Sequence, residues 1–336
     1  MQRRDDDAPV LSVVIKAFNE EKNIAACIRS VQAATTAWKT EIIVADSHSL
    51  DRTVEVASAL GVTVVRLANS SERSCGAGGQ LGYQFAHGKY LFMMDGDMEL
   101  VPGFLEEAMA MMEADERVAG IGGLLEEKSS ALEFVQRNSR ADSSYKLGRV
   151  PYLNSGGLYR VEAIRDVGYF TNRNLHSREE FELGVRLCGR GWHLLRIGTV
   201  SVQHYGHSIS SWRLLFIRWR SKYFHGYGEL LRSAFGQPHF MPALKTSMLF
   251  VAVVVWWVTL GLVAALALAT EQPLFALTAL GIFAFPLGVL LLRKKNPTVA
   301  LYSIALWNFH AAALVAGLFR RQVDPRQKLE AEVVHQ

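Results

Sequence analysis

The sequence is poor in cysteine, carries little net charge and starts without an apolar segment. Three cysteines, Cys27, Cys75 and Cys188, are scattered among 336 residues, which excludes the spacing of a zinc site or of a disulfide framework. We therefore expect reduced thiols in a reducing compartment. The net charge of +4 is too small to predict binding to nucleic acid. The polar tail over residues 1–9 lacks the apolar core of a signal peptide, so no secretory signal is predicted.

Hydrophobic residues make up 50% of the chain, but they are spread unevenly. Up to about residue 243 apolar and polar residues alternate, whereas residues 244–320 are mostly apolar. A helix needs roughly 20 apolar residues to cross a bilayer. The sequence therefore predicts about three transmembrane helices, at about 246–270, 273–292 and 297–319. A polar tail is predicted after them, over 321–336.

Basic residues predict the orientation of these segments. The turn at 270–273 has no positive charge, whereas Arg293-Lys-Lys295 follows the second segment, and positive charge stays on the cytoplasmic side. We expect a multi-pass protein of the inner or plasma membrane with its N-terminal domain in the cytoplasm. Three spans would leave the basic residues after 319 outside, against this rule. Either the third segment, which contains Asn308 and His310, is re-entrant or the rule fails, and the sequence leaves both open.

Residues 10–210 alternate β-branched runs with amphipathic stretches, which predicts parallel βαβ units and an α/β, doubly wound sheet. A helix is predicted from Glu179, with Phe181, Val185, Leu187 and Cys188 facing inward. Residues 211–243 are rich in Trp, Phe, Tyr and Arg, which predicts amphipathic interfacial helices or, in the plainer interpretation, surface helices. The earlier predicted elements are strands at Leu11–Ala17, 41–45, 62–67 and from Tyr90, and helices from an Asn23 cap to about Ala34 and over 53–60.

Acidic residues follow the predicted strands. Asp95 and Asp97 end the Tyr90 strand, with Gly96 allowing a tight turn between them, and Asp46 ends an earlier strand at the same edge. Open α/β sheets bind ligands at this edge. Two nearby carboxylates repel each other unless a cation lies between them, and hard oxygen ligands suit Mg²⁺ or Mn²⁺. The alternative is a solvated turn.

Two further groups of residues could act in a site or be structural. Glu179 and Glu180 begin a predicted helix, where the helix dipole alone would favour carboxylates. His204 and His207 follow a probable strand and could each be a metal or phosphate ligand or a structural histidine.

Taken together, the motifs resemble those of an inverting family 2 glycosyltransferase with the GT-A fold and a membrane-embedded C-terminus, of the exopolysaccharide or polyprenyl-phosphate type. The resemblance covers roughly residues 10–210. The matching stretches are Ser12-Val-Val-Ile-Lys-Ala-Phe-Asn-Glu20, Ile43-Val-Ala-Asp46 with Asp51-Arg-Thr53, Asp95-Gly-Asp97, Gly156-Gly-Leu-Tyr-Arg160 and Glu179-Glu-Phe-Glu-Leu183.

The resemblance implies a role for each matching residue. Glu180 is the expected general base, with Glu179 as its rival, and Asp97, with Asp95 and His204, is expected to ligate the divalent metal. Gly156, Gly157, Arg218 and Trp219 are expected on the acceptor side. The residues expected to bind the nucleotide are Ala17, Asn19, Glu20, Asp46, Asp51, Arg73 and Asp95.

Two departures from the family pattern bear on the function. The chain has Gly78-Gly-Gln80 where many relatives carry Ala-Arg-Asn, so we expect Arg73 to substitute for the missing arginine. Leu215 stands where processive synthases carry a Gln before Arg218-Trp219.

We therefore predict the transfer of one sugar from a nucleotide-diphosphate sugar, with UDP the commonest family choice, to a lipid-linked or saccharide acceptor in cell-surface polysaccharide or glycolipid biosynthesis. The predicted partners include membrane lipid and exclude nucleic acid. The alternatives are a processive polysaccharide synthase and a non-catalytic membrane scaffold that binds nucleotide sugar.

Overall fold

The computed structural model describes residues 8–128, 146–206, 209–294 and 296–336. These residues form two compact units. Unit 1 comprises Met1–Ser211 together with Gln322–Gln336, and unit 2 comprises Trp212–Arg321.

The first half of unit 1 has the predicted βαβ organisation. Four parallel strands lie in the order β3-β2-β1-β4, and their apolar residues are almost completely buried because helices cover both faces. Lys16 pairs with Asp95 and Ala17 with Asp46, so the predicted acidic residues do meet at one edge. The elements are β1 (Leu11–Ala17), α1 (Ile24–Ala34), β2 (Thr40–Asp46), α2 (Thr53–Ser58), β3 (Thr63–Leu67), η2 (Ser70–Glu72), α3 (Cys75–Gln84) and β4 (Tyr90–Asp95).

The second half of the sheet is mixed rather than parallel. β8 runs antiparallel to β4 and β6, β9 runs parallel to β6, and β5 and β7 run antiparallel to β9. The expected mostly parallel sheet therefore holds for the first half of a ten-stranded sheet. The elements are β5 (Met98–Leu100), α4 (Phe104–Ala114), β6 (Val118–Glu127), β7 (Gly148–Val150), β8 (Gly157–Arg160), α6 (Val161–Asp166), α7 (Glu179–Gly189) and β9 (His193–His204).

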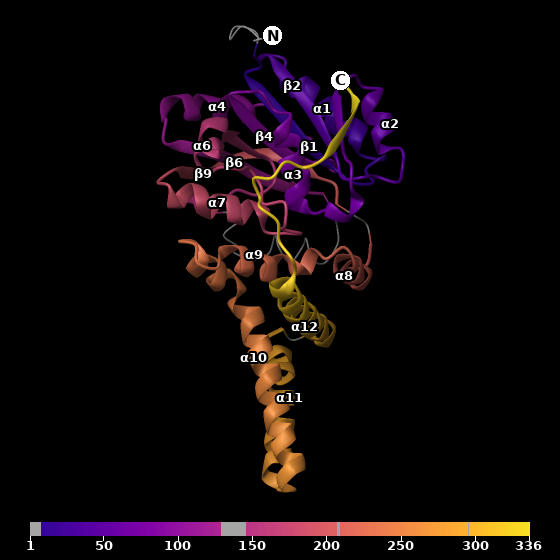
Figure 1. The fold of residues 1–336 in the computed structure, drawn as a ribbon, viewed down its shortest axis with the longest axis vertical. Coiled ribbons are helices and arrows are strands. Elements are labelled where there is room, and N and C mark those ends of the chain that lie inside the picture. Colours follow the sequence, from indigo (N-terminus) through magenta and orange to yellow (C-terminus); the bar gives the residue numbers. More distant parts are fainter. Residues whose placement is uncertain (1–7, 129–145, 207–208, 295) are drawn as a thin grey trace. The chain divides into compact units, whose positions relative to one another are not determined.

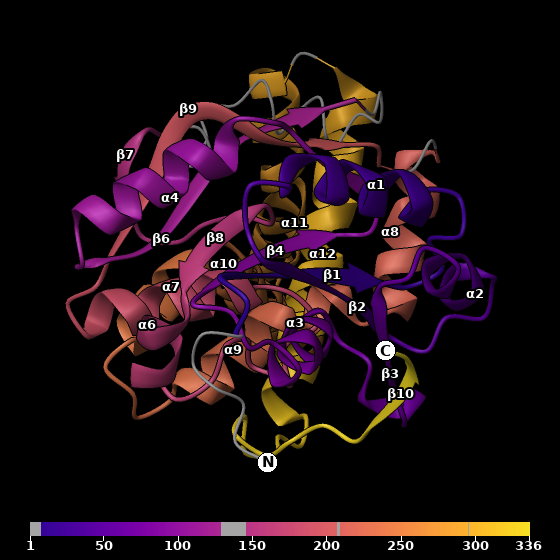
Figure 2. The ribbon, with the colours of Figure 1, turned by 90° about the horizontal axis from the view of Figure 1, so that it is seen from above.

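Helices cover both faces of this sheet, as expected. Figure 2 shows α1 and α4 on one side of β1 and β4, and α3 and α6 on the other. Two separate apolar clusters fill the two interfaces, one around Ile28 and Phe104 and the other around Leu81 and Leu187. Both clusters hold the strands rigidly, which fixes the carboxyl ends where the acidic residues lie.

The last residues of the chain belong to unit 1. β10 (Ala331–His335), part of the yellow segment that ends at C in Figure 1, pairs antiparallel with β3 (Figure 2). Without β10, β3 would be an open edge of the sheet. Leu329 is buried in the second apolar cluster, and its backbone exchanges two hydrogen bonds with the side chain of Gln84. From the sequence we expected only a polar tail here.

Two local predictions were wrong. Asn23 precedes α1, but its amide donates to Glu20 Oε2 at 2.9 Å and makes no cap. In α7 Leu187 is buried as predicted, but Phe181 and Val185 are only half-buried and Cys188 is exposed. The other buried residues of α7 are Glu179, Glu182, Leu183 and Gly184. The inward face is displaced because the buried Glu182 is paired with Arg186 at 2.9 Å, which a search for apolar residues does not detect.

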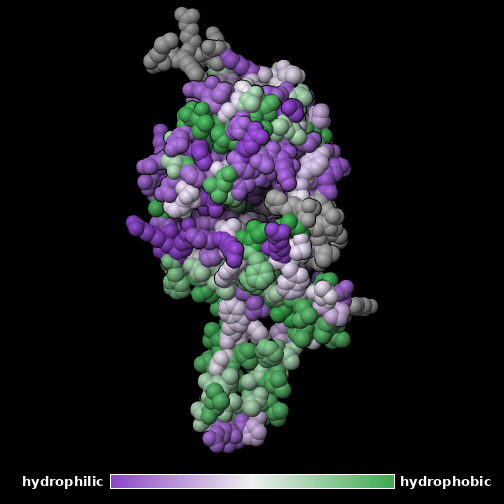
Figure 3. Space-filling model, turned by 90° about the vertical axis from the view of Figure 1, so that its right-hand side faces the viewer, coloured by the Kyte–Doolittle hydropathy of each residue, from purple (hydrophilic) through white to green (hydrophobic). Residues whose placement is uncertain are grey.

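The elements of unit 2 that the structure describes are all helices. Among them, three are long and apolar enough to cross a membrane by length and composition. Figure 3 shows that the long helices present a mostly hydrophobic surface. The elements are α8 (Ser211–Arg220), η4 (Tyr223–His225), α9 (Gly226–Ala234), α10 (Phe240–Thr270), α11 (Pro273–Lys294) and α12 (Pro297–Phe319).

Candidate active site

Asp95 and Asp97 lie at the turn that joins β4 to β5. Asp95 is the last residue of β4, and Met98 begins β5. The Gly96 N–H donates to Lys16 O at 2.8 Å, and a Cβ at Gly96 would lie only 3.1 Å from Glu20 Cγ. The turn is therefore packed tightly against the loop after β1, as a ligand-binding edge requires.

Asp97 belongs to a chain of three side chains. His204 Nε2 lies 3.1 Å from Asp97 Oδ2, and His204 Nδ1 lies 2.8 Å from Glu127 Oε2. Strand register makes this arrangement, because His204 pairs with Met98 of β5 on one side and with Glu127 of β6 on the other. Burial opposes a charge on His204, but the two carboxylates raise its pKa to about 9.

A second cluster joins the Asp95 carboxylate to the start of α7. Lys16 Nζ lies 3.0 Å from Asp95 Oδ1 and 3.2 Å from Glu179 Oε1. Burial lowers the pKa of Lys16, but Asp95, Glu179 and Glu180 together raise it well above its usual value. Lys16 is therefore a cation shared by carboxylates that are distant in the sequence.

Glu180 has the environment of a proton acceptor. Burial and the neighbouring Glu179 raise its pKa to about 8, against the opposing charges of Lys16 and Arg178. Arg178, which precedes the helix, has φ of +73°, a conformation that is unusual for a side chain of this size. Such strained residues gather at functional sites.

The loops after β1 and β2 interlock beside Asp46. Asp46 is fully buried, and its Oδ2 accepts from Ser49 N at 3.0 Å and lies 3.5 Å from Arg66 Nε. Its Oδ1 has no hydrogen-bond partner among the described residues. Asn19, with φ of +58°, ties the two loops together, since it donates to Ser49 Oγ and accepts from Leu50 N. A buried acceptor without a partner is costly unless a ligand donates to it.

Glu20 and Asp51 lie in these same loops. Burial, Asp97 and Asp95 raise the pKa of Glu20 to about 7, although Asn23 donates to it. Burial alone would raise the pKa of Asp51, but hydrogen bonds from Thr53 and from the Glu21 N–H lower it below its usual value. Asp51 therefore holds the loop through its backbone contacts.

The remaining expected residues fall into three groups. Ala17 ends β1, and Arg73 stacks over the Phe18 ring at 4.0 Å. Gly156 has φ of +84°, and its N–H donates to Met93 O of β4. Gly157, the first residue of β8, pairs with the same Met93. A Cβ at Gly156 would collide with Val202, and one at Gly157 would be tight against Tyr159, which gives both glycines a packing role.

Arg218 and Trp219 lie in α8, in unit 2. The Trp219 ring packs against Phe309 with 5.2 Å between ring centroids, and the Arg218 guanidinium lies 4.8 Å from the Tyr223 ring centroid. His207, a second candidate ligand in the sequence, lies outside the described residues.

Sequence reasoning missed Lys16, Glu127 and Arg66. A lysine inside a strand of Val, Ile and Ala is a signal, because a buried charge needs a partner. Nothing in the local sequence marks Glu127 or Arg66. Glu127 is the last residue of β6 and Arg66 lies within β3, and each meets its partner only because the strands pair.

Asp97 and His204 are the two side chains that could share a metal ion. Among the described residues no group of three or more His, Cys, Asp or Glu side chains is arranged to hold one. Mg²⁺ and Mn²⁺ often take only one or two protein ligands and complete their shell with water and substrate phosphates. Glu127 behind His204 is the kind of outer partner that fixes the ring of a ligating histidine.

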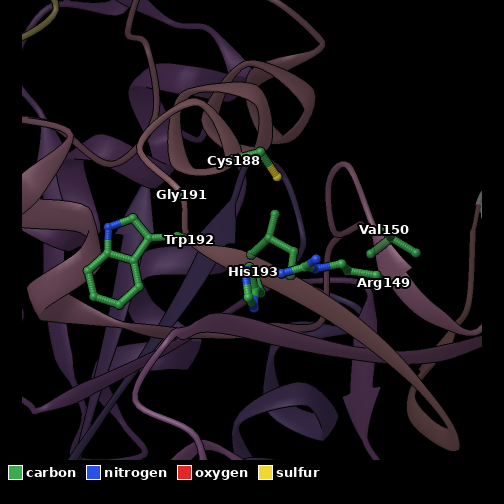
Figure 4. Close-up of a pocket in the computed structure, with 7 residues that line it drawn as sticks. Arg149, Val150, Cys188, Gly191, Trp192 and His193 are labelled. Carbon is green, nitrogen blue, oxygen red and sulfur yellow. The ribbon is translucent and has the colours of Figure 1, made fainter.

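A pocket elsewhere in unit 1 is unrelated to these side chains. Figure 4 shows Arg149, Cys188, Trp192 and His193 around it. His193 begins β9 and His204 ends it, so roughly 35 Å of strand separates the pocket from Asp97.

Comparison with known proteins identifies the family of the N-terminal part of the chain. Residues 12–168 match the family model "Glycosyl transferase family 2". The chain carries a family 2 glycosyltransferase domain. This domain contains the interlocked loops, the Asp95–Asp97 turn, Gly156 and the first residue of β8, Gly157.

Two curated relatives and one solved structure are similar to the chain. Succinoglycan biosynthesis protein ExoA of Rhizobium meliloti is 25% identical over 94% of this chain and 96% of that protein. Dodecaprenyl-phosphate galacturonate synthase of Rhizobium johnstonii is 26% identical over 47% of this chain and 49% of that protein. The mannosyltransferase PcManGT from Pyrobaculum calidifontis, solved with GDP-Man and Mn²⁺, matches with a TM-score of 0.59 at 17% identity, over 93% of this chain and 88% of that one. The last comparison confirms a GT-A-like fold.

Proposed function

We propose that the protein is a membrane-bound inverting hexosyltransferase. It moves one sugar from a nucleotide-diphosphate sugar, in the first place a UDP-sugar, to a lipid-linked acceptor at the cytoplasmic face of the cell membrane. The observation that carries the proposal is the joining of the Asp95 turn to the start of α7 through Lys16. It brings a donor-binding edge and a candidate base into one cluster inside a family 2 glycosyltransferase.

Asp97 and His204 would hold a divalent metal ion, Mg²⁺ or Mn²⁺, with Asp95 toward the ribose or the metal. The ion supplies positive charge to the departing diphosphate. Glu127 keeps the Nδ1 side of His204 engaged, so that Nε2 faces Asp97. The solved neighbour contains GDP-Man and Mn²⁺, which supports a metal and adds GDP-sugars to the donors worth testing.

Glu180 acts as the general base in this proposal. It accepts the proton of the acceptor hydroxyl while that oxygen attacks the anomeric carbon. The bond from that carbon to the diphosphate oxygen breaks, the diphosphate leaves with the electron pair, and the sugar centre inverts. Glu179 is held in an ion pair with Lys16, which leaves Glu180 as the carboxylate free to take a proton. A placed base contributes about 10²–10⁴-fold to the rate.

The buried Oδ1 of Asp46 is suited to accept a hydrogen bond from an N–H of the nucleobase. Its other oxygen is already used by Ser49 and Arg66, so Oδ1 is the oxygen left for a ligand. Glu20, Asn19 and Asp51 hold the two loops beside Asp46 and would border the nucleobase.

A lipid acceptor is supported by the three long apolar helices and by the printed names of the relatives, one a succinoglycan biosynthesis protein and one a dodecaprenyl-phosphate galacturonate synthase. Leu215 in place of the Gln of processive synthases favours the addition of a single sugar.

A donor screen tests the proposal. Full-length protein in lipid nanodiscs is mixed with UDP- and GDP-sugars, Mn²⁺ or Mg²⁺ and a polyprenyl phosphate, and the release of nucleoside diphosphate is measured. We expect release with one donor that depends on both metal and acceptor. Asp97→Asn should lose this activity, and Glu106→Gln, an exposed carboxylate on α4, should keep it. Full activity of Asp97→Asn with the metal chelated would disprove the metal role.

A further inference from the structure

α12 lies along the short helices of unit 2 over most of its length. Near its start the Tyr302 ring meets Trp212 of α8 with 5.3 Å between centroids, and in its middle Phe309 meets Phe216 at 5.8 Å. One residue further on, the His310 ring lies 4.3 Å from Phe224 of η4. These contacts run in order along both segments, so α12 follows the α8–η4–α9 layer.

The C-terminal end of α12 is fixed to α9 at its backbone. A Cβ added at Gly228 of α9 would lie 2.0 Å from Leu314 O, so the two helices touch without side chains between them. Arg320, just after α12, pairs with Glu229 at 2.6 Å, and Glu229 is fully buried. Arg232 donates to Leu318 O at 2.7 Å. The end of α12 is therefore part of the α9 contact surface.

α10 and α11 form a helical hairpin, and the beginning of α12 lies at the end of that hairpin where α9 leads into α10. α10 starts six residues after α9, and α11 returns beside it, joined by the short turn at Glu271 and Gln272. Trp256 of α10 donates to Ile282 O of α11 at 2.9 Å, which confirms that the two helices pack together. α12 starts at Pro297, close after α11 ends. A 23-residue helix that crossed a bilayer would end roughly 35 Å from its start, away from α9.

The C-terminal residues give a second and independent argument. Residues 322–336 belong to unit 1, where β10 pairs with β3 and Arg173 donates to Gln327 O and Lys328 O. The chain thus leaves unit 1 after Ser211 and re-enters it at Gln322. A chain that returns to one folded unit on one side of a membrane has crossed that membrane an even number of times.

We infer that α12 is not a third span but an in-plane helix, which with α8 and α9 forms a layer on the membrane surface around a two-helix hairpin of α10 and α11. This inference rests on the membrane location proposed above. The layer presents exposed Trp212, Phe216 and Ile217 beside Arg213 and Arg220, which suits the headgroup boundary of the leaflet where the hairpin enters.

The charge pattern fits this topology. With two crossings, Arg293 and Lys294 lie on the same side as the basic residues that follow α12, and the turn with Glu271 lies on the other side. The conflict with the positive-inside rule, which three spans would create, is removed. The amide oxygen of Asn308 in α12 is also satisfied within unit 2, since it accepts from Trp257 Nε1 at 2.8 Å.

Cysteine labelling of the full-length protein tests the topology. Glu271→Cys, Lys294→Cys, Arg321→Cys and Gln336→Cys are exposed to a membrane-impermeant maleimide in intact cells and after permeabilisation, and the labelled peptides are identified by mass. The exposed native Cys188 is the internal control for unit 1. We expect Glu271→Cys to react in intact cells, and the other three and Cys188 to react only after permeabilisation.

The outcomes separate this inference from the proposed function. Labelling of Arg321→Cys in intact cells, with Lys294→Cys protected, would mean that α12 crosses and would overturn the inference alone. If Glu271→Cys and Cys188 are both protected, the hairpin does not cross, and both the membrane location and the inference fail. The reverse pattern, with only Glu271→Cys protected, would support the inference and contradict the cytoplasmic orientation.

Depth measurements supply a second readout that does not depend on chemical access. Nitroxide labels at Leu301 and Ala316, near the two ends of α12, and at Leu306 in its middle should report similar shallow depths in nanodiscs. A label at Leu280 in the middle of α11 is the matched control and should be deep. A depth at Leu306 equal to that at Leu280, with Leu301 and Ala316 shallow, would overturn the inference.

Discussion

At the residue scale, the site depends on one buried cation. Lys16 contacts Asp95 and Glu179 directly, and its charge also acts on Glu180. Without it, the carboxylates of Asp95 and Glu179 would repel each other with no cation between them. Lys16 thus ties the turn after β4 to the start of α7.

The raised pKa of Glu180 predicts a pH profile. A base must be deprotonated to act, so kcat/KM of the wild type should rise with pH and level off above about 8, the pKa of Glu180. Lys16→Met removes a positive charge, which raises the pKa of Glu180 and moves the rise to higher pH. Glu179→Gln removes a negative charge and moves it to lower pH. Each shift should be about one unit.

The control for this profile is Glu106→Gln, whose curve should coincide with that of the wild type. Identical curves for Lys16→Met, Glu179→Gln and the wild type would mean that Glu180 is not the titrating base.

Glu127 provides a second prediction at this scale. Glu127→Gln keeps the size of the side chain but removes the charge that orients His204. Affinity for Mn²⁺, measured by calorimetry with nucleoside diphosphate present, should fall about 10–100-fold. Glu126→Gln, on the neighbouring exposed position, should leave it unchanged. Equal affinity in both variants would remove Glu127 from the metal site.

At the scale of elements, local patterns predicted the segments that are marked by a run of apolar residues. β1 (Leu11–Ala17) and α12 (Pro297–Phe319) have the predicted bounds, and β4 ends at the predicted acidic turn. The acidic site residues could be proposed because they follow such strands.

The missed features depend on pairing between distant segments. The residues around β10 are mostly polar and do not predict a strand. The segment becomes a strand because β3 offers it an open edge. The mixed second half of the sheet and the Glu127–His204 contact depend on the register between β6 and β9, which no local pattern encodes. The inward face of α7 was misplaced because a buried ion pair, Glu182 with Arg186, replaces apolar residues there.

The C-terminal strand should contribute measurably to the stability of unit 1. Leu329→Ala leaves a cavity in an apolar cluster and should lower the free energy of unfolding by about 2–5 kcal/mol. Val334→Ala, at a position 46% exposed in β10, is the matched control and should change it by less than about 0.5 kcal/mol. Thermal unfolding of the purified protein, followed by circular dichroism, measures both. Equal stability of the two variants would contradict the packing of the tail against unit 1.

At the scale of the whole molecule, the chain combines a family 2 glycosyltransferase domain with a helical unit suited to a membrane. The tail links the two in sequence, since it leaves α12 and returns to the sheet of unit 1. The chain therefore joins the domain to the helical unit twice, after Ser211 and before Gln322.

The most direct test of the central claim is the transfer of labelled sugar into lipid. Wild type and Glu180→Gln are incubated in nanodiscs with the donor found in the screen, metal and polyprenyl phosphate, and the label in the organic phase is counted. We predict a lipid product bearing a single sugar, formed by the wild type and formed by Glu180→Gln about 10²–10⁴-fold more slowly, with nucleotide binding retained. Equal rates in the two proteins, or a label found only in water-soluble polymer, would contradict the account.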